Sequence, residues 1–539
     1  MEDGICISRS EWRWVAAWGA AILLVTSLPY LYGALLSTPQ NQFGGFVLGV
    51  EDGNSYLAKM RLGATGSWQF HLFYTSEPHA GAYLLLFHIL LGKLARLSGL
   101  SLILAYHLAR LACGGLLLGT VYCFAAFFTR LRPVRQLTFW LVAMGSGLGW
   151  LVMLTGLLPQ LGLPLDFYSP EAFAFLMLFG LPHLSLALAC TLWAILWLLM
   201  AWERQRLAYA GAAALALTVA ALVAAFYPGV AVAVIGAALL LRAWWAGSVW
   251  GIGRELGLAA LASFPAALVA LYNAYVFSTN PIFKAWSEQN LILSPAPVHY
   301  LLSFGPLLAL ALVGAAGEWR AASARSRLLI GWCAVVPLLV YVPFNLERRM
   351  ALGVQVPLAL LAGLGLWRWL GGLDGARSGR PGIGWRIAAT GLVVLLSLSN
   401  LTILAGVSLE VSRRAPPIFQ PGWLVNAADW LGAHAGADQV VLASRPSGNA
   451  LPTRMGARVF LGHASETAYS EAKQVMVTRF FGPGDESFRR QLLRDYGISY
   501  VFCGPDELAL GDFCPADRTY LRLVYETGPA SIYQVELGP

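Results

Sequence analysis

Runs of about 20 apolar residues recur along most of the chain, and each is long enough to cross a bilayer as a helix. Only 12% of the 539 residues are charged, whereas 58% are hydrophobic, which leaves too little charge to cover a soluble protein of this size. The sequence therefore predicts a polytopic α-helical membrane protein with about 11 to 13 spans. Arginines in loops account for the net charge of +8, so a nucleic-acid partner is not expected.

The apolar stretches end near residue 408, and the remainder of the chain has the composition of a soluble domain. We predict a membrane core over residues 1–408, whose outer loop 37–79 carries an acidic motif, and an α/β domain over residues 409–539. The predicted spans lie at about 14–36, 80–97, 101–129, 136–158, 172–202, 207–226, 228–246, 256–277, 299–317, 327–344, 351–371 and 385–408.

Short runs rich in Val, Ile, Tyr and Phe predict strands in the C-terminal part of the chain. These runs are Gln439–Ser444, Ala457–Gly462, Ile498–Cys503, Leu521–Glu526 and Ser531–Glu536. Amphipathic patterns predict helices over Ala464–Phe481 and Glu486–Tyr496. Strands that alternate with helices indicate a small α/β domain that follows the last span.

Basic residues between the spans set the expected orientation, because cytoplasmic loops carry an excess of Arg and Lys. Five basic loops satisfy this rule together, with the N-terminus in the cytoplasm of a bacterial-type plasma membrane and the C-terminal domain outside. They contain Arg130, Arg132 and Arg135; Arg204 and Arg206; Arg242 and Arg254; Arg320, Arg325 and Arg327; and Arg368, Arg377, Arg380 and Arg386.

The orientation raises a parity problem in the first part of the chain. Loops 37–79 and 159–170 are both expected outside, but three apolar stretches lie between them. Either stretch 80–97 lies at the interface without crossing, or stretch 101–129 breaks at Gly114-Gly115 into two short legs.

The outer loop 37–79 contains the adjacent carboxylates Glu51 and Asp52, followed at helical spacing by Tyr56 and Lys59. This spacing predicts a short interfacial helix with the carboxylates at its N-terminus, where the helix dipole stabilises an anion. A carboxylate at the mouth of a membrane cavity can take a proton from an attacking hydroxyl. By spacing alone, a solvated pair of loop carboxylates is the simpler interpretation.

An acid after the first span, then a Tyr and a short helix that ends in Gly, resembles the first outer loop of the GT-C membrane glycosyltransferases. The stretch Gly92…Gly99-Leu100-Ser101…His107…Arg110 resembles the same family, as does the overall layout. The resemblance implies a polyprenyl-phosphate-linked sugar donor, transfer at the outer face, and Asp52 as the base, with Glu51 as its neighbour. Two features depart from the family pattern: residues 37–50 precede the acid, and the pair has the order Glu-Asp.

Two further outer loops contribute candidate residues. The family often has another acid in its second outer loop, which binds the acceptor or a metal, and Asp166 or Glu171 is the counterpart here. His183 and Tyr56 are also candidates for this site, and a divalent metal is one interpretation, although the spacing is not diagnostic of a metal site. Ser169-Pro170-Glu171 also has the pattern of a helix start.

Arg348 and Arg349 form a basic pair on the expected outer side. Because Arg and Lys are usually enriched in cytoplasmic loops, this pair requires an explanation. Arg binds phosphate oxygens in a bidentate manner, which favours a clamp on the donor phosphate, with Lys59 and Arg61 as lesser candidates. Anchoring to anionic lipid headgroups explains the pair equally well.

We predict an inverting glycosyltransferase that works in the lipid bilayer, and two other functions remain open. A transporter or flippase of a lipid-linked substrate would place ionisable groups near the bilayer midplane, whereas here the carboxylates cluster in outer loops. A non-catalytic protein of an envelope assembly would use the α/β domain as its interaction module.

Overall fold

The computed structural model describes residues 5–248, 250–321, 324–371, 381–483, 485–511, 513 and 515–537. The chain divides into two compact units. The first contains Met1–Leu28, Leu108–Asn273 and Ile292–Gly406. The second contains Pro29–His107, Ala274–Leu291 and Val407–Pro539.

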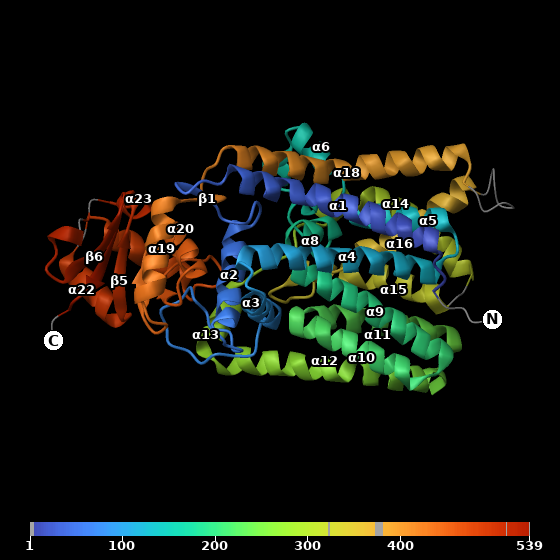
Figure 1. Ribbon diagram of the computed structural model, residues 1–539. Coiled ribbons are helices and arrows are strands. Elements are labelled where there is room, and N and C mark those ends of the chain that lie inside the picture. Colours follow the sequence, from blue (N-terminus) through green and yellow to red (C-terminus); the bar gives the residue numbers. More distant parts are fainter. Residues whose placement is uncertain are drawn as a thin grey trace. The chain divides into compact units, whose positions relative to one another are not determined.

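Long apolar helices dominate the first unit (Figure 1). Among the described residues, eight helical stretches are long and apolar enough to cross a membrane, which makes this a polytopic α-helical membrane protein. Helices suit this environment because they satisfy every backbone hydrogen bond internally. The long helices are α1 (Arg9–Leu36), α4 (Leu102–Phe128), α9 (Pro182–Arg204), α11 (Tyr227–Ala246), α12 (Gly253–Thr279), α14 (Pro297–Ala321), α16 (Gln355–Leu366) with the π-helical turn η4 (Trp367–Gly371), and α18 (Ile383–Ser412).

Shorter helices complete the first unit. Three of them occupy predicted spans: α5 (Arg132–Ala143), α10 (Leu207–Val223) and α15 (Ala324–Leu339), with 12, 17 and 16 residues. The others are α6 (Gly149–Leu154), α7 (Leu158–Leu161), α8 (Ala174–Gly180), and the 3-10 turns η1 (Leu165–Phe167), η2 (Trp250–Ile252) and η3 (Glu347–Ala351).

Two predicted spans are wrong as single helices. Stretch 136–158 is interrupted between α5 and α6, and the backbone N–H groups of Gly147 and Gly149 donate there to the Asp166 carboxylate. Stretch 172–202 is interrupted between α8 and α9 at Leu181, the residue before Pro182, where proline disfavours a continuous helix.

Stretch 80–97 contains α3 (Leu86–Ser98), whose 13 residues are fewer than the roughly 20 that a membrane span needs. The alternative break at Gly114-Gly115 is wrong, because α4 continues through both glycines.

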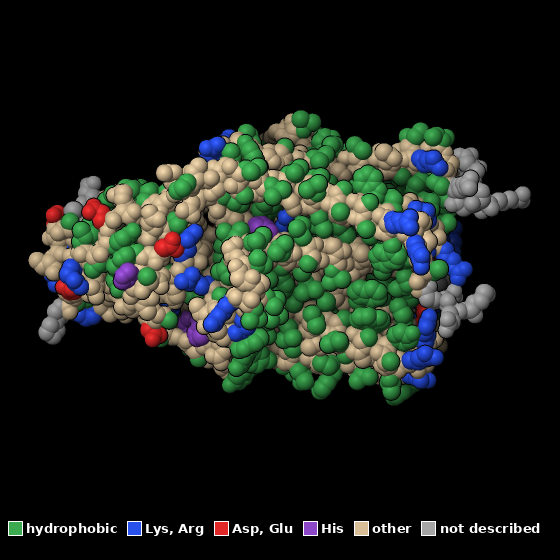
Figure 2. All heavy atoms as spheres, in the orientation of Figure 1, with side chains coloured by type: hydrophobic (Ala, Val, Ile, Leu, Met, Phe, Trp, Pro, Cys, Tyr) green, Lys and Arg blue, Asp and Glu red, His purple; other side chains and the backbone are tan. Residues whose placement is uncertain are grey.

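Basic residues gather at one end of the helices of the first unit, where Figure 2 shows a band of Lys and Arg side chains. Ion pairs join the ends of neighbouring helices there, and Arg377 and Arg380 lie outside the described residues. The pairs are Arg325 with Glu203 at 2.6 Å, Arg242 with Glu255 at 3.1 Å, Arg368 with Glu318 at 2.7 Å, and Arg135 with Glu11 at 3.0 Å.

The second unit contains a five-stranded sheet of order β4-β3-β5-β7-β6, and all five predicted strands are confirmed. Strands β3 and β4 and strands β3 and β5 pair parallel, whereas β7 pairs antiparallel with β5 and β6. The strands are β3 (Val440–Leu442), β4 (Arg458–Val459), β5 (Ile498–Cys503), β6 (Leu521–Thr527) and β7 (Ala530–Val535).

Helices cover both faces of this sheet. Successive residues of a strand point to opposite faces, so each strand contributes side chains to the contacts on both sides. Val441 and Phe502 pack with α19 (Gly422–His434), a helix that the sequence analysis did not predict. Leu442 and Val501 pack on the other face with α21 (Ser470–Phe481) and α22 (Glu486–Asp495). The smaller elements are α20 (Arg445–Ala450), η5 (Leu451–Thr453), α23 (Pro505–Leu508) and η6 (Pro515–Asp517).

Segments from earlier in the chain belong to the same unit. Strand β1 (Asn41–Phe43) pairs antiparallel with β2 (Phe419–Pro421), and α13 (Pro281–Gln289) lies in the Ala274–Leu291 segment. Helix α2 (Val50–Ala64) packs closely against α3 through two glycines. A Cβ atom at Gly63 would lie 1.9 Å from the Ile89 carbonyl oxygen, and one at Gly92 would lie 1.8 Å from that of Met60.

We predict that Gly63→Ala and Gly92→Ala each separate α2 from α3 and destabilise the protein by about 1–3 kcal/mol or more. Thermal unfolding of the detergent-purified protein measures the effect. Gly257→Ala is the matched control, because a Cβ at this helical position meets nothing within 4 Å. Equal melting temperatures for all three variants would contradict the close helix contact.

Candidate functional site

The predicted short helix after the first span is confirmed as α2, with Glu51 and Asp52 in its first turn. The helix follows Gly49, whose positive φ of 59° suits glycine. Its apolar side chains, including Leu57 and Met60, are buried. The N-terminal end of the helix dipole therefore lies at the acidic pair, where it stabilises negative charge.

Asp52 meets a histidine from the C-terminal part of the same unit. Its Oδ1 lies 3.3 Å from Nε2 of His463, in the segment that follows β4. The Asp52 side chain is 62% exposed and the His463 side chain only 4% exposed. The exposed carboxylate of Asp52 is thus contacted on its protein side by the buried imidazole of His463.

The protonation of His463 follows from its backbone contacts. The N–H groups of Ser465 and Glu466 both donate to Nδ1, each at 3.2 Å. A nitrogen that accepts cannot carry a proton, so the neutral ring carries its proton on Nε2. That N–H is the group next to Asp52.

The segment around His463 is held by several independent contacts. The Thr467 hydroxyl accepts the N–H groups of Gly462 and His463, and the Gln289 side chain donates to the carbonyl of Ser465 at 2.7 Å. A Cβ at Gly462 would lie 2.5 Å from the carbonyl oxygen of Gly448 in α20, so only glycine fits there.

A buried ion pair lies on the same face of α2, two turns after Asp52. Lys59 Nζ lies 2.6 Å from Oε1 of Glu466, and the Ser55 hydroxyl donates to the same oxygen at 2.8 Å. Burial raises the pKa of Glu466, but the charge of Lys59 and the hydrogen bonds from Lys59 and Ser55 outweigh burial and hold this pKa below its ordinary value. Both side chains of the pair are less than a tenth exposed.

Glu51 is engaged differently from its neighbour. Its Oε1 accepts the N–H of Ala464 at 2.7 Å and lies 3.5 Å from Nε of Arg445 in α20. The Asn449 side chain donates to the backbone carbonyl of Glu51 at 3.3 Å. Glu51 thus joins α2 to two C-terminal segments.

The other predicted residues of α2 lie against protein rather than at the carboxylates. Tyr56 stacks on His88 at 4.7 Å between ring centroids and on Tyr106 at 5.9 Å. Arg61 lies near Gly432 of α19, with its Nε buried. Lys59 is the only one of these three that belongs to the cluster around Glu466.

The first unit contains the remaining predicted residues, and Asp166 is buried among hydrogen-bond donors. Its Oδ2 accepts the N–H groups of Gly147 at 3.0 Å and Gly149 at 3.2 Å, and the Ser399 hydroxyl at 2.7 Å. The carboxylate thereby satisfies the backbone where the predicted 136–158 helix is interrupted, which is a structural task.

Glu171 forms an ion pair with one of the two predicted arginines. Its Oε1 lies 3.3 Å from Nε of Arg349, while the Arg348 guanidinium lies 4.5 Å from the Tyr168 ring centroid. The predicted helix start at Ser169-Pro170-Glu171 is wrong: the segment forms a turn, and α8 begins at Ala174. His183 lies in the first turn of α9.

Sequence reasoning missed His463, Glu466 and Arg445. Glu466 lies inside the predicted helix Ala464–Phe481, which begins too early, because α21 begins only at Ser470. The Gly-His run directly after a strand was the available signal, since functional side chains often follow strand ends.

Comparison with solved structures identifies the fold. AftD, an arabinofuranosyltransferase from Mycobacteria, superposes with a TM-score of 0.57 at 15% identity, over 99% of this chain and 40% of that chain. The Archaeoglobus fulgidus oligosaccharyltransferase tethered to an acceptor peptide gives 0.53 at 12% identity, over 97% and 74%. ArnT from Cupriavidus metallidurans gives 0.50 at 17% identity, over 97% and 98%.

The chain has the fold of the GT-C membrane glycosyltransferases. No protein-family model matches its sequence, and no curated protein does either. The fold expected from the acidic loop and the layout of spans is therefore confirmed by structure, at identities too low for the sequences to show it.

In the described part of the chain, no group of three or more His, Cys, Asp and Glu side chains is placed to hold a metal ion. At the acidic pair, His463 directs a protonated nitrogen toward Asp52, so in this tautomer it cannot serve as a ligand together with the carboxylate.

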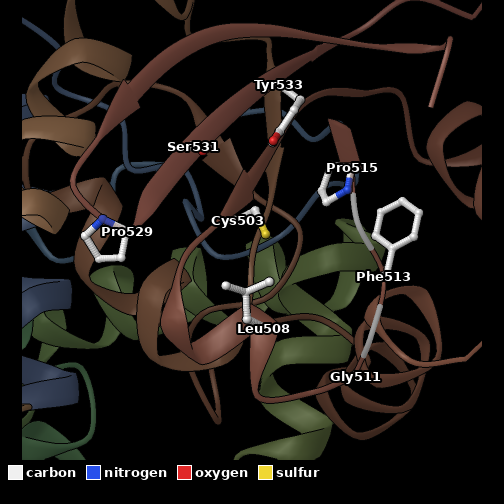
Figure 3. Close-up of a pocket in the computed structure, with 8 residues that line it drawn as sticks. All are labelled: Cys503, Leu508, Gly511, Phe513, Pro515, Pro529, Ser531 and Tyr533. Carbon is white, nitrogen blue, oxygen red and sulfur yellow. The ribbon is translucent and has the colours of Figure 1, made fainter. Parts of the chain in front are cut away.

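A pocket of about 390 Å³ lies on the α/β domain (Figure 3). None of the eight described residues that line it is Lys, Arg, His, Asp or Glu. They are Cys503, Leu508, Gly511, Phe513, Pro515, Pro529, Ser531 and Tyr533.

We predict that Lys59→Met and Glu466→Gln each destabilise the protein by about 3–5 kcal/mol, because either change leaves the other buried charge unpaired. The double variant loses less than the sum of the two single variants. Thermal unfolding at pH 7 measures all three proteins. Additive losses would show that the two charges do not stabilise each other.

The same pair predicts a pH dependence. The folded pKa of Glu466 lies below the ordinary 4.5, so its stabilisation is fully present above about pH 4.5 and is lost as the pH falls through the folded pKa. The difference in melting temperature between wild type and Glu466→Gln therefore narrows on acidification. A difference that stays constant from pH 7 to pH 3.5 would contradict this assignment.

Proposed function

We propose that the protein transfers a sugar from a polyprenyl-phosphate donor to an acceptor at the extracytoplasmic face of the membrane. The observation that carries the proposal is the Asp52 carboxylate. It is exposed, lies in the first turn of a helix after the first span, and is contacted by a buried histidine in a chain with the GT-C fold. The donor class comes from the resemblance of the first outer loop to that of the GT-C membrane glycosyltransferases.

In the proposed reaction Asp52 acts as the general base. It takes the proton of the acceptor hydroxyl as that oxygen attacks the anomeric carbon of the sugar. The bond from this carbon to the phosphate oxygen breaks, and the polyprenyl phosphate leaves with its electron pair. A single displacement of this kind inverts the anomeric configuration. No step is routed through a metal ion.

The proposed orientation follows from the basic end of the helices. With the Arg-rich loops in the cytoplasm, as the positive-inside rule predicts, the N-terminus lies inside, and loop 37–79 and the α/β domain lie outside. Asp52 then faces the compartment in which lipid-linked sugars are presented to outer acceptors. The α/β domain, assigned to residues 409–539, contributes to the site through the segment at His463.

The proposed ligands of the donor phosphate are Arg348 and Arg349, and Arg349 is expected to contribute less to phosphate binding. Arg349 is paired with Glu171, so part of its charge is already compensated. Lys59 is a weaker candidate than the sequence suggested, since its ammonium is buried against Glu466. Glu171, His183 and Tyr56 remain proposed acceptor-site residues, whereas the buried hydrogen bonds of Asp166 favour a structural role.

We predict that Asp52→Asn lowers kcat by about 10²–10⁴-fold, because the amide cannot accept the acceptor proton. The measurement is transfer of a radiolabelled sugar from a synthetic polyprenyl-phosphate donor, with the full chain reconstituted in liposomes. Glu51→Gln is the comparison variant. A large loss in Glu51→Gln with an active Asp52→Asn would identify Glu51 as the base instead.

We predict that Arg348→Ala raises KM for the donor about tenfold with a smaller change in kcat, because it removes a charge-assisted contact to the donor phosphate. Arg348→Lys recovers only part of this loss, since Lys cannot bind in a bidentate manner. Arg413→Ala is the control, because this residue forms an exposed pair with Glu410. An unchanged donor KM in Arg348→Ala would favour a lipid-headgroup anchor.

A further inference from the structure

We propose that His463, contributed by the C-terminal α/β domain, positions the reactive carboxylate. In this view its Nε2–H holds Oδ1 of Asp52, so that Oδ2 of Asp52 faces the acceptor hydroxyl. The inference rests on the proposed function, in which Asp52 is the base. It adds a residue more than four hundred positions further along the chain to the machinery of the reaction.

The need for a positioning group follows from the exposure of Asp52. Its side chain is 62% exposed and sits at the start of a helix, so solvent alone would leave its carboxylate free to rotate. A base must be held within hydrogen-bond reach of the proton that it takes. The contact of 3.3 Å from His463 supplies that restraint on one oxygen.

The ring of His463 is itself immobilised, as a positioning residue requires. Two backbone N–H groups, from Ser465 and Glu466, donate to Nδ1 and fix both the tautomer and the ring plane. The Tyr74 ring packs beside it, with 5.4 Å between centroids. Only 3% of the residue is exposed.

Several charged and titratable groups face this pair. Helix α2 contributes Glu51 and Lys59, the His463 segment contributes Glu466, α20 contributes Arg445, and the segment before α3 contributes Tyr74. Lys59 compensates Glu466, and Arg445 lies against Glu51. Burial and the charge of Glu466 raise the pKa of Tyr74 well above its ordinary value, so Tyr74 stays neutral.

The test compares His463→Phe, which removes the donor, with His463→Gln, whose amide N–H reaches toward the same place. We expect His463→Phe to lose at least tenfold in kcat with little change in donor KM, and His463→Gln to recover part of the loss. The acid limb of the pH–rate profile shifts to higher pH by roughly one unit in His463→Phe, because the charged form of Asp52 loses the ring N–H that lies 3.3 Å away.

A second readout does not depend on sugar transfer. A water-soluble carbodiimide reacts with protonated carboxyl groups, so the pH dependence of Asp52 labelling, followed by peptide mass spectrometry on the full chain, reports its protonation. We expect the labelling midpoint to move upward in His463→Phe and to return toward wild type in His463→Gln. His434→Phe is the matched control, because His434 lies exposed on α19, where its Nδ1 lies 2.8 Å from the carbonyl oxygen of Trp430 in the same helix.

The outcomes separate the two proposals. If His463→Phe keeps both the wild-type pH limb and the wild-type labelling midpoint, the positioning role is overturned even where Asp52→Asn is inactive. If the wild type transfers no sugar but the labelling midpoint still moves, the proposed reaction fails and the His463–Asp52 contact stands. A loss of activity with unfolding, and with no recovery in His463→Gln, would show a purely structural histidine.

Discussion

The buried ion pair between Lys59 and Glu466 is the interaction on which the candidate site depends. A buried charge requires a partner, so α2 and the segment after β4 can bury these groups only together. The two residues are 407 positions apart in the chain. Asp52, Ser55 and Lys59 lie at positions i, i+3 and i+7 of α2, on one face of the helix. The pair that fixes Lys59 therefore also turns Asp52 toward His463.

The close packing of α2 against α3 also fixes the orientation of α2. Gly63 and Gly92 allow the two backbones to touch, which a Cβ at either position would prevent. With α3 on one side and the His463 segment on another, α2 has little freedom to rotate. Backbone contact and a buried charge pair thus together present the acidic end of the helix to solvent, and the sequence places two carboxylates there.

Carboxylates carry structural tasks elsewhere in this fold, which explains why residue type alone does not identify a site. Asp166 satisfies backbone N–H groups at a helix interruption, and Glu171 pairs with Arg349. Both looked equivalent to Asp52 in the sequence, as acids in an outer loop. What separates them is exposure: Asp166 and Glu171 are buried, whereas the Asp52 side chain is mostly exposed.

The sequence by itself determined the features that depend on local patterns. Hydropathy determined the membrane class, short runs rich in Val, Ile, Tyr and Phe determined the five strands, and helical spacing determined the short helix at Glu51-Asp52. Local patterns failed where contacts with distant residues determine the conformation of a segment. Residues 464–469 have the amphipathic pattern of a helix, but they are not helical, and they form hydrogen bonds with α2 and with Gln289. Only the tertiary structure decided that His463 and Glu466 meet Asp52 and Lys59, because a pairing across four hundred residues leaves no periodic signal in either segment.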